Sequence, residues 1–318
     1  VRAITEALRE EMARDEKVCI IGEDVGSGEG AFSATRGLLK EFGPNRVKDM
    51  PIVESTIMGM AVGMALTGLK PVAEIMFLDF CALAMDPIVN SAAKWRYFFG
   101  GQFKVPLTLR TPSGSLGGAG PGHSQSLEVW FAHIPGLKVV MPSTAYDAKG
   151  LLKSSIRDEN PVIFIENRNF YPDKVQIPEE EYTIPLGQAD VKREGSDVTV
   201  VATSRMVFEA MKAADELAAD GISVEIVDPR TITPLDKETI LNSVKKTGRL
   251  VVVHEAVRTY GIGGEIAATV AEEAFDYLDA PVKRVGTRFT PIAVSTPMQN
   301  FSLPWAKDIV AAVKEIIN

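Results

Sequence analysis

The sequence predicts an α/β protein of two doubly wound domains, each with a mostly parallel sheet that helices cover on both faces. Short apolar runs alternate with helical patterns along the whole chain, which is typical of parallel sheets. The 318 residues exceed the length of one ordinary domain. A polar segment with two prolines, at about 167–184, interrupts the alternation and reads as a linker. We therefore expect one domain on each side of it.

The first half alternates between apolar runs of strand length and longer amphipathic stretches. The apolar runs predict strands over 18–22, 72–77, 107–110, 138–141 and 162–166. The amphipathic stretches predict helices over 2–14, 56–69, 80–97, 127–132 and 145–157. Thr144, followed three residues later by Asp147, predicts a capping box for the last of these helices.

The second half repeats the alternation. We expect strands over 198–202, 224–227, 250–254 and 282–286, and helices over 206–219, 266–277 and 305–317. Gly221 is a C-terminal stop for the first of these helices. A further helix is expected to start at Thr233-Pro234, with a hydroxyl cap, a proline in the first position and Asp236 in the first turn.

Composition excludes several classes of function. Apolar residues make up 46% and charged residues 24%, as in ordinary globular proteins, and the net charge of −8 argues against a nucleic-acid partner. Cys19 and Cys81 are far apart, without metal-ligand spacing, and indicate small core residues in a reducing compartment. No apolar run is long enough to cross a membrane. No signal peptide is visible, and because Val1 already lies in a helical pattern we expect some residues upstream.

Glu54 is the most informative single residue. It stands before a nearly uncharged stretch, 55–68, that is rich in small residues and predicts a tightly packed helix. A carboxylate buried there costs several kcal/mol unless a specific group pairs with it. One interpretation is a surface acid that stabilises the helix dipole. The other is a carboxylate held ready for a protonated ring nitrogen of a cofactor.

Two further segments suggest a site. Phe80 follows an apolar run at a strand-to-helix junction, where α/β sheets bind ligands, and is either a core residue or a stacking surface for a flat ring. The stretch 114–122 is rich in glycine and leads to His123-Ser124-Gln125, where a histidine can move a proton near neutral pH. His133 and His254 are interpreted as structural.

Several segments together resemble one enzyme family, the beta subunits of the thiamine-diphosphate-dependent 2-oxo acid dehydrogenase decarboxylase components, which act on pyruvate, branched-chain 2-oxo acids or acetoin. The resemblance covers essentially the whole chain. It is carried by Gly22-Glu23-Asp24-Val25-Gly26, Asp49-Met50-Pro51-Ile52-Val53-Glu54, Asn90-Ser91-Ala92-Ala93-Lys94, His123-Ser124-Gln125, Pro135-Gly136-Leu137-Lys138, Asp147-Ala148-Lys149-Gly150, Asp228-Pro229-Arg230-Thr231 and Ser243-Val244-Lys245-Lys246-Thr247.

The resemblance implies a pyrimidine-binding thiamine-diphosphate-type domain over 1–183 and a transketolase C-terminal-type domain over 184–318. It implies a heterotetramer of two alpha and two beta chains within a multienzyme complex. In the family the alpha chain holds the cofactor's diphosphate through Mg²⁺ with a GDG motif. This sequence has Gly22-Glu23-Asp24 instead, so we expect that it cannot hold thiamine diphosphate alone.

The resemblance also assigns site residues. Glu54 would pair with the ring nitrogen of the aminopyrimidine, Phe80 would pack on that ring, and Ile52 would neighbour it through its backbone. His123 would contact the substrate carboxylate and supply a proton during decarboxylation and acyl transfer to lipoamide. A structural monovalent cation, K⁺ in character, would lie against the main-chain carbonyls of Leu107, Ser155, Asp158 and Asn160.

Departures from the family pattern leave the assigned residues Glu54, Phe80 and His123 in place. They are Met50 for a usual Thr, Pro87 for Gln, Gly122 for Gln, and the stretch Thr296-Pro297-Met298-Gln299, in a region that in the family contacts the lipoyl acyltransferase core. Two other functions remain open, the C-terminal half of a split transketolase-like transferase and a non-catalytic scaffold subunit. We expect a bacterial or archaeal cytoplasm, or the mitochondrial matrix of a eukaryote. The sequence does not choose among pyruvate, branched-chain 2-oxo acids and acetoin.

Overall fold

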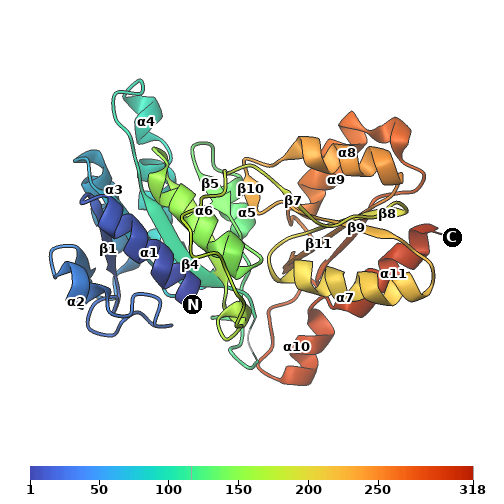
Figure 1. Ribbon diagram of the computed structural model, residues 1–318, viewed down its shortest axis with the longest axis horizontal. Coiled ribbons are helices and arrows are strands. Elements are labelled where there is room, and N and C mark those ends of the chain that lie inside the picture. The colour runs from blue at the N-terminus through green and yellow to red at the C-terminus, as the bar shows by residue number, and fades with distance from the viewer. Residues whose placement is uncertain (116, 318) are drawn as a thin grey trace. The chain divides into compact units, whose positions relative to one another are not determined.

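The computed structural model describes residues 1–115 and 117–317. The chain divides into two compact units, residues 1–113 with 130–186, and residues 114–129 with 187–318 (Figure 1). The glycine-rich stretch and His123 therefore belong to the second unit, although the sequence places them amid the elements of the first. Each unit is described separately.

The first unit is a parallel sheet with helices on both faces. Its strands are β1 (Val18–Gly22), β2 (Val47–Asp49), β3 (Lys70–Glu74), β4 (Thr108–Ser113), β5 (Lys138–Val140) and β6 (Val162–Asn167). They lie in the order β5-β6-β4-β3-β1-β2, and every neighbouring pair among them is parallel. The strands β1, β4 and β6 are buried along their whole length, as in sheets that are covered on both faces.

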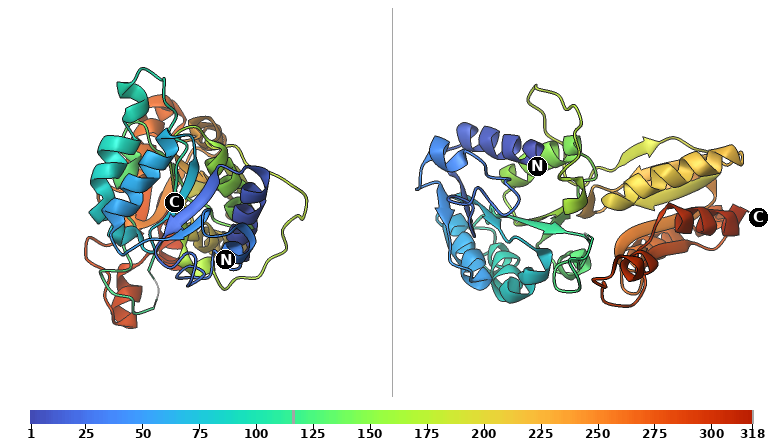
Figure 2. Two further views of the ribbon diagram at one scale, coloured as in Figure 1. Left: turned by 90° about the vertical axis from the view of Figure 1, so that its left-hand side faces the viewer. Right: turned by 90° about the horizontal axis from the view of Figure 1, so that it is seen from below.

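The helical elements of the first unit are α1 (Arg2–Arg14), α2 (Leu38–Phe42), α3 (Glu54–Leu66), η1 (Leu78–Ala84), η2 (Pro87–Ala92), α4 (Trp95–Phe98), α6 (Ala145–Arg157) and η3 (Arg168–Phe170). The helices α1 and α6 pack against each other, and Figure 2 shows them together on one side of the sheet. On the other side, α3 packs against β3, η1 and η2. A short helix, α5 (Glu128–Ala132), begins at the end of residues 114–129, which belong to the second unit, and ends in the first unit.

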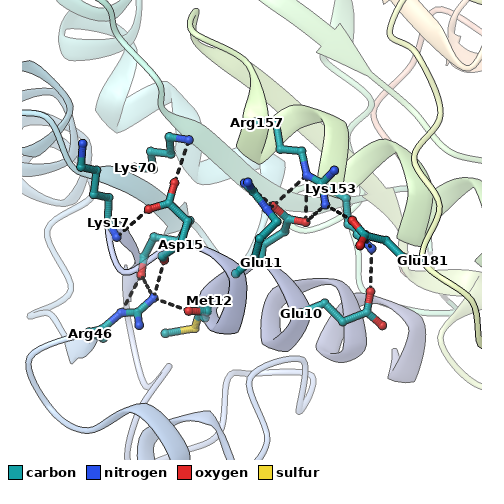
Figure 3. A network of polar contacts seen from close by, with 12 residues as sticks. Glu10, Glu11, Met12, Asp15, Lys17, Arg46, Lys70, Lys153, Arg157 and Glu181 are labelled. Carbon is teal, nitrogen blue, oxygen red and sulfur yellow. Dashed lines mark hydrogen bonds and ion pairs between the residues drawn. The ribbon is translucent and has the colours of Figure 1, made fainter.

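Charged side chains join α1 to α6 (Figure 3). Glu11, which is fully buried, accepts hydrogen bonds from Arg157 Nη2 at 2.6 Å and Nε at 3.0 Å. Lys153 Nζ lies 2.7 Å from Glu10 Oε2. Because these pairs link helices that are more than 140 residues apart in sequence, they fix the N-terminal helix on the sheet.

The second unit is a smaller mixed sheet in the order β12-β11-β8-β9-β7. Its strands are β7 (Asp190–Arg193), β8 (Val198–Ala202), β9 (Val224–Asp228), β11 (Leu250–Val257) and β12 (Lys283–Thr287). The short strand β10 (Thr231–Thr233) also belongs to this part of the chain but lies outside the five-stranded sheet. Only the edge strand β7 pairs antiparallel within this order.

Helices cover both faces of this second sheet. They are α7 (Arg205–Ala219), α8 (Lys237–Thr247), α9 (Gly263–Glu273), η4 (Phe275–Tyr277), α10 (Thr296–Ser302) and α11 (Ala306–Ile317). Figure 1 shows α7 and α11 side by side on one face and α8 with α9 on the other. The α7 and α11 face packs on β8, β9 and β11 to form the core.

The predicted α/β class is confirmed, and several element bounds agree. The helices over 2–14 and 145–157 and the strands over 18–22 and 198–202 have the expected limits. Thr144 caps α6 as expected, because its Oγ1 accepts a hydrogen bond from Asp147 N at 3.0 Å. Gly221, just past the end of α7, has a positive φ of +78°, which a glycine stop requires.

Two expected helices are wrong as stated. The continuous helix over 80–97 is instead a 3₁₀ segment, a π segment and one short α-helix, and Pro87 stands at the break because it lacks an N–H for the helical ladder. Thr233 does not cap the next helix. It ends strand β10, and Asp236 caps α8 by accepting from Thr239 N at 3.1 Å. The strand expected over 72–77 lies earlier in the chain, over Lys70–Glu74. The strand β7 and the helix α10 are not predicted from the sequence patterns.

Candidate active site

Glu54 is the first residue of α3, and its side chain is half-buried. Across the part of the chain that is described, no hydrogen bond or ion pair engages its carboxylate. The start of a helix favours a negative charge because the first backbone N–H groups are unpaired. The carboxylate is therefore tolerated at this position and remains available for a ligand.

Phe80 is brought to the same region. It lies in η1, the segment that packs against α3, and it is half-buried. Cys81, the next residue, is fully buried, and its thiol pKa is raised to about 12, mainly by burial and in part by the negative charges of Asp79 and Glu54. Because α3 packs against η1, Glu54 and Phe80 lie on adjoining elements.

Phe80 packs against a cluster of aromatic rings. The Phe80 ring meets that of Phe77 edge-on at 5.5 Å, and Phe77 in turn meets Phe32 at 5.8 Å. The Arg168 guanidinium lies 4.7 Å from the Phe77 ring centre. Edge-to-face contacts stabilise pairs of aromatic rings, so Phe80 is a supported and partly exposed apolar surface.

A buried charge network lies at the ends of the strands that lead to this surface. Arg110 in β4 donates to both oxygens of Glu166 in β6, at 2.6 and 3.0 Å, and to Glu74 in β3 at 2.6 Å. Tyr171 donates to Glu166 at 2.5 Å. Burial and the neighbouring Glu166 raise the pKa of the Glu74 carboxyl, against the lowering effect of Arg110. The network holds three neighbouring strands in register next to Phe77.

Ile52 precedes α3 and is largely exposed, at 69%. Exposure of a large aliphatic side chain two residues before an unpaired carboxylate is consistent with a surface that a ligand covers. Burial and the negative charges of Asp24 and Glu54 raise the pKa of the Glu23 carboxyl, just after the end of β1. The sequence does not single out Glu23 as a site residue, since the charge effect depends on strands and helices far apart in sequence.

His123 lies in the second unit and is exposed. The two residues on its C-terminal side, Ser124 and Gln125, line a cavity of about 400 Å³ inside that unit. Ser124 is only 3% exposed, and its Oγ has no hydrogen-bond partner among the described residues. Glu54, Phe80 and Ile52 are thus gathered in one unit, and His123 stands in the other.

Glu128, five residues beyond His123, is a candidate that sequence reasoning misses. Its side chain is 1% exposed, and Oε2 has no partner among the described residues. Burial, with a smaller contribution from the Glu255 charge, raises its pKa to about 7. No sequence signal distinguishes it from an ordinary helix-start acid.

The four residues assigned to a cation lie just before β4, in the last turn of α6 and between α6 and β6. The carbonyl of Leu107 accepts from Val162 N at 2.8 Å, and the carbonyl of Ser155 accepts from Asp158 N at 3.3 Å. Asn160 N donates to Asp158 Oδ1 at 2.8 Å. The Asp158 carboxylate also pairs with Lys138, and no cluster of three or more His, Cys, Asp or Glu side chains suited to a metal occurs in the described ranges.

His254 and His133 are not part of either group. His254 is fully buried in β11 and lies 3.1 Å from the Ala256 carbonyl through Nδ1. Its Nε2 lacks a partner within residues 1–115 and 117–317, and burial lowers its pKa to about 4. It is a neutral interior histidine, whereas His133 is exposed on the surface.

Two known protein families match the two halves of the chain. The family profile described as the transketolase pyrimidine binding domain matches residues 1–174, and the one described as the transketolase C-terminal domain matches residues 187–309. None of the described helices is long and apolar enough to cross a membrane.

Curated relatives match over nearly the whole chain. The mitochondrial pyruvate dehydrogenase E1 component subunit beta-1 of Arabidopsis thaliana is 47% identical, over 98% of this chain and 87% of that protein. The pyruvate dehydrogenase E1 component subunit beta of Rickettsia felis is also 47% identical, over 99% and 96%. The beta subunit of the acetoin:2,6-dichlorophenolindophenol oxidoreductase of Bacillus subtilis is 45% identical, over 99% and 96%.

A solved structure has the same fold. It is described as a split gene transketolase in an inactive beta4 tetramer, and it aligns with a TM-score of 0.82 at 26% identity, over 99% of this chain and 97% of that one.

Proposed function

We propose that this chain supplies the pyrimidine-binding half of a shared active site. The chain belongs to the family of beta subunits of thiamine-diphosphate-dependent 2-oxo acid and acetoin dehydrogenases. The enzyme is an oxidoreductase that acts on a 2-oxo acid or acetoin. Its partner is an alpha chain that holds the diphosphate through Mg²⁺, in an assembly of two alpha and two beta chains. The acyl product passes to lipoamide on an acyltransferase core.

The observation that carries the proposal is the unpaired carboxylate of Glu54 on a helix that packs against the segment bearing Phe80. A flat ring with a hydrogen-bonding nitrogen fits this pair, because Phe80 offers a supported apolar face and Glu54 a free acceptor. Ile52 would neighbour the ring through its backbone. These groups suit an aminopyrimidine better than a phosphate, which needs cationic or N–H partners.

The chain's own residues have defined tasks. Glu54 would share a proton with the ring nitrogen through a carboxylate oxygen, and Phe80 would orient the ring. His123 would hold or move a proton at an imidazole nitrogen near neutral pH and contact the substrate carboxylate. Thiamine diphosphate, when bound, supplies the electron sink for the bond-breaking step. A K⁺ ion near Leu107, Ser155, Asp158 and Asn160 would be structural.

The test is a co-expression with the neighbouring alpha-type reading frame. Reduction of an artificial electron acceptor, dependent on thiamine diphosphate and Mg²⁺, is then measured with pyruvate, 3-methyl-2-oxobutanoate and acetoin in parallel. We expect turnover with one of these, absent from either chain alone. A formed tetramer that binds the cofactor but turns over none of them would contradict the proposal.

The Glu54→Gln variant tests the carboxylate. It should lower turnover at least ~10²-fold, the low end for removing acid–base help. The Gln side chain also loses the favourable charge at a helix start, so the matched control is Glu238→Gln, which removes an exposed first-turn acid of α8. The control should turn over normally. Equal rates for Glu54→Gln and the unmodified chain would support the scaffold alternative.

The split-transketolase alternative has a specific observation in its favour, the structural likeness to a split gene transketolase. The relatives at 45–47% identity carry oxidoreductase names, which outweighs a 26% match. Sugar phosphates in the same co-expression assay distinguish the two. Ketose-phosphate cleavage without 2-oxo acid turnover would favour the transferase.

A further inference from the structure

The segment 114–129, here called the histidine segment, carries His123 and packs within the second unit. Three of its glycines, Gly114, Gly118 and Gly120, have φ values of +87°, +84° and +73°. Glycine adopts such values at little cost, so the local backbone does not by itself define the path of the segment. Contacts with the rest of the second unit must therefore decide where His123 lies.

Glu255, in β11, holds the start of the segment through two hydrogen bonds. Its Oε1 accepts hydrogen bonds from Ser115 N at 2.8 Å and from Ser115 Oγ at 3.0 Å. Its Oε2 accepts from Arg205 Nε at 2.8 Å. Both Glu255 and Ser115 are buried, at 8% and 6% exposure, so water competes little for these bonds.

Glu255 is itself held in place from two sides. Arg205, the first residue of α7, is 6% exposed, and its guanidinium lies 5.0 Å from the Trp305 ring centre. The Glu255 carbonyl accepts from Thr287 Oγ1 at 2.5 Å. Burial would raise the pKa of Glu255, but Arg205 and the Ser115 hydrogen bonds outweigh burial and lower it. The carboxylate is a fixed, charged acceptor.

A second contact touches the middle of the histidine segment. A Cβ placed on Gly120 would lie 2.8 Å from Val294 Cγ2, and one on Gly118 would lie 3.5 Å from the Val294 carbonyl. The approach of Gly120 to the Val294 side chain is apolar, whereas the hydrogen bonds to Glu255 are directional. Of the two, Glu255 sets the start of the segment.

We infer that Glu255 is a positioning residue for His123. Glu255 fixes Ser115 at the start of the histidine segment, and the position of Ser115 in turn determines where His123 lies. This inference rests on the proposed function of His123. The competing explanation is that the Arg205–Glu255 pair only stabilises the second unit. A purely stabilising pair would not change the dynamics of residues 114–123 selectively, nor would its effect depend on His123.

The first measurement is hydrogen exchange on the alpha–beta complex, which needs no turnover. Glu255→Gln places an amide group against the Arg205 guanidinium and weakens the hydrogen bonds from Ser115. Amide exchange over 114–123 should rise at least roughly tenfold, the factor that corresponds to ~1.4 kcal/mol in a local opening equilibrium. Unchanged exchange in this stretch would overturn the inference.

The matched control is Glu225→Gln. Glu225, in β9 of the same unit, is also a buried carboxylate that accepts a backbone bond, from Gly195 N at 3.3 Å, and pairs with a cation, Lys246. It has no bond to the histidine segment within the described chain. Exchange over 114–123 should be unchanged in this variant.

The second measurement is a double-mutant cycle on turnover, with Glu255→Gln and His123→Ala singly and together. We expect Glu255→Gln to lower kcat about tenfold alone and less than about twofold when His123 is already absent. Equal effects in both backgrounds would overturn the inference. If His123→Ala turns over normally, the proposed role of His123 fails, while the exchange result still decides whether Glu255 holds the segment.

Ser115→Ala is the milder variant, for use if Glu255→Gln does not fold. It removes only the hydroxyl bond and keeps the backbone bond to Glu255. Exchange over 117–123 and the dependence on His123 should change in the same direction, by a smaller factor. No change in either would overturn the inference as well.

Discussion

Replacing Arg110 by Met should destabilise the first unit by about 3–5 kcal/mol at pH 8, the range for removing one partner of a buried ion pair. The structure gives the reason. Arg110 is 1% exposed and makes three charge-assisted hydrogen bonds to Glu74 and Glu166, whose side chains are 4% and 2% exposed. Met fills a similar length but leaves two carboxylates buried side by side with Tyr171 as the remaining described donor to Glu166.

The loss should shrink as the pH falls. Burial already raises the pKa of Glu74 in the folded chain, and without Arg110 the lowering effect of the guanidinium disappears. A carboxyl whose folded pKa lies above its unfolded pKa stabilises the fold at low pH and loses that contribution as the pH rises through the folded value. The Arg110→Met variant should therefore approach the parent near pH 5 and fall behind it at pH 8.

Urea unfolding followed by tryptophan fluorescence measures this. Trp95 and Trp130 lie in the first unit and Trp305 in the second, so a Trp305→Phe background reports the first unit alone. The control is Arg36→Met, which breaks the exposed pair with Glu29, whose side chains are 68% and 46% exposed, and should cost less than about 1 kcal/mol. A loss below about 1 kcal/mol for Arg110→Met at pH 8, or a loss that does not vary with pH, would refute the reasoning.

Two further predictions concern local features. Thr144→Ala removes the cap of α6 and should cost ~1 kcal/mol in urea unfolding of the first unit, and Thr144→Ser should restore most of it; no loss for alanine would mean that the cap bond to Asp147 is worth nothing. Burial raises the pKa of Glu128 to about 7, so the parent should lose roughly 2.5 kcal/mol relative to Glu128→Gln between pH 5 and pH 8, at about 1.36 kcal/mol per pKa unit. Parallel pH profiles for the two proteins would contradict the raised pKa.

Local signals in the sequence determine much of the fold. The Thr144–Asp147 capping box and the glycine after α7 are predicted correctly, because each depends on bonds within a few residues. The limits of α1, β1 and β8 follow from apolar periodicity, which a single segment carries by itself. The uncharged surroundings of Glu54 and the strand-to-helix position of Phe80 distinguish both residues in the sequence alone, and their roles remain predictions.

Local signals also mislead where two mechanisms compete. The apolar spacing around Pro87 favours one long helix, but the helix is interrupted there because proline has no backbone N–H for the helical hydrogen bond. Thr233-Pro234 has the composition of a helix start, yet Thr233 pairs in β10 and the carboxylate of Asp236 takes the cap. Asp236 stands three residues further on, so the same stretch contains a second, equally acceptable cap.

The sequence by itself determined the α/β class, the family and the residues that merit testing. Only the tertiary structure decided which of them meet. The buried grouping of Arg110 with Glu74 and Glu166 joins three strands through residues that lie 36 and 56 positions from Arg110 in the sequence. Glu255 and Ser115 are 140 residues apart. Pairings of this kind depend on how the sheets are threaded, and no short pattern encodes them. The placement of the histidine segment in the second unit has the same cause, since a glycine-rich backbone takes its path from the surfaces it packs against.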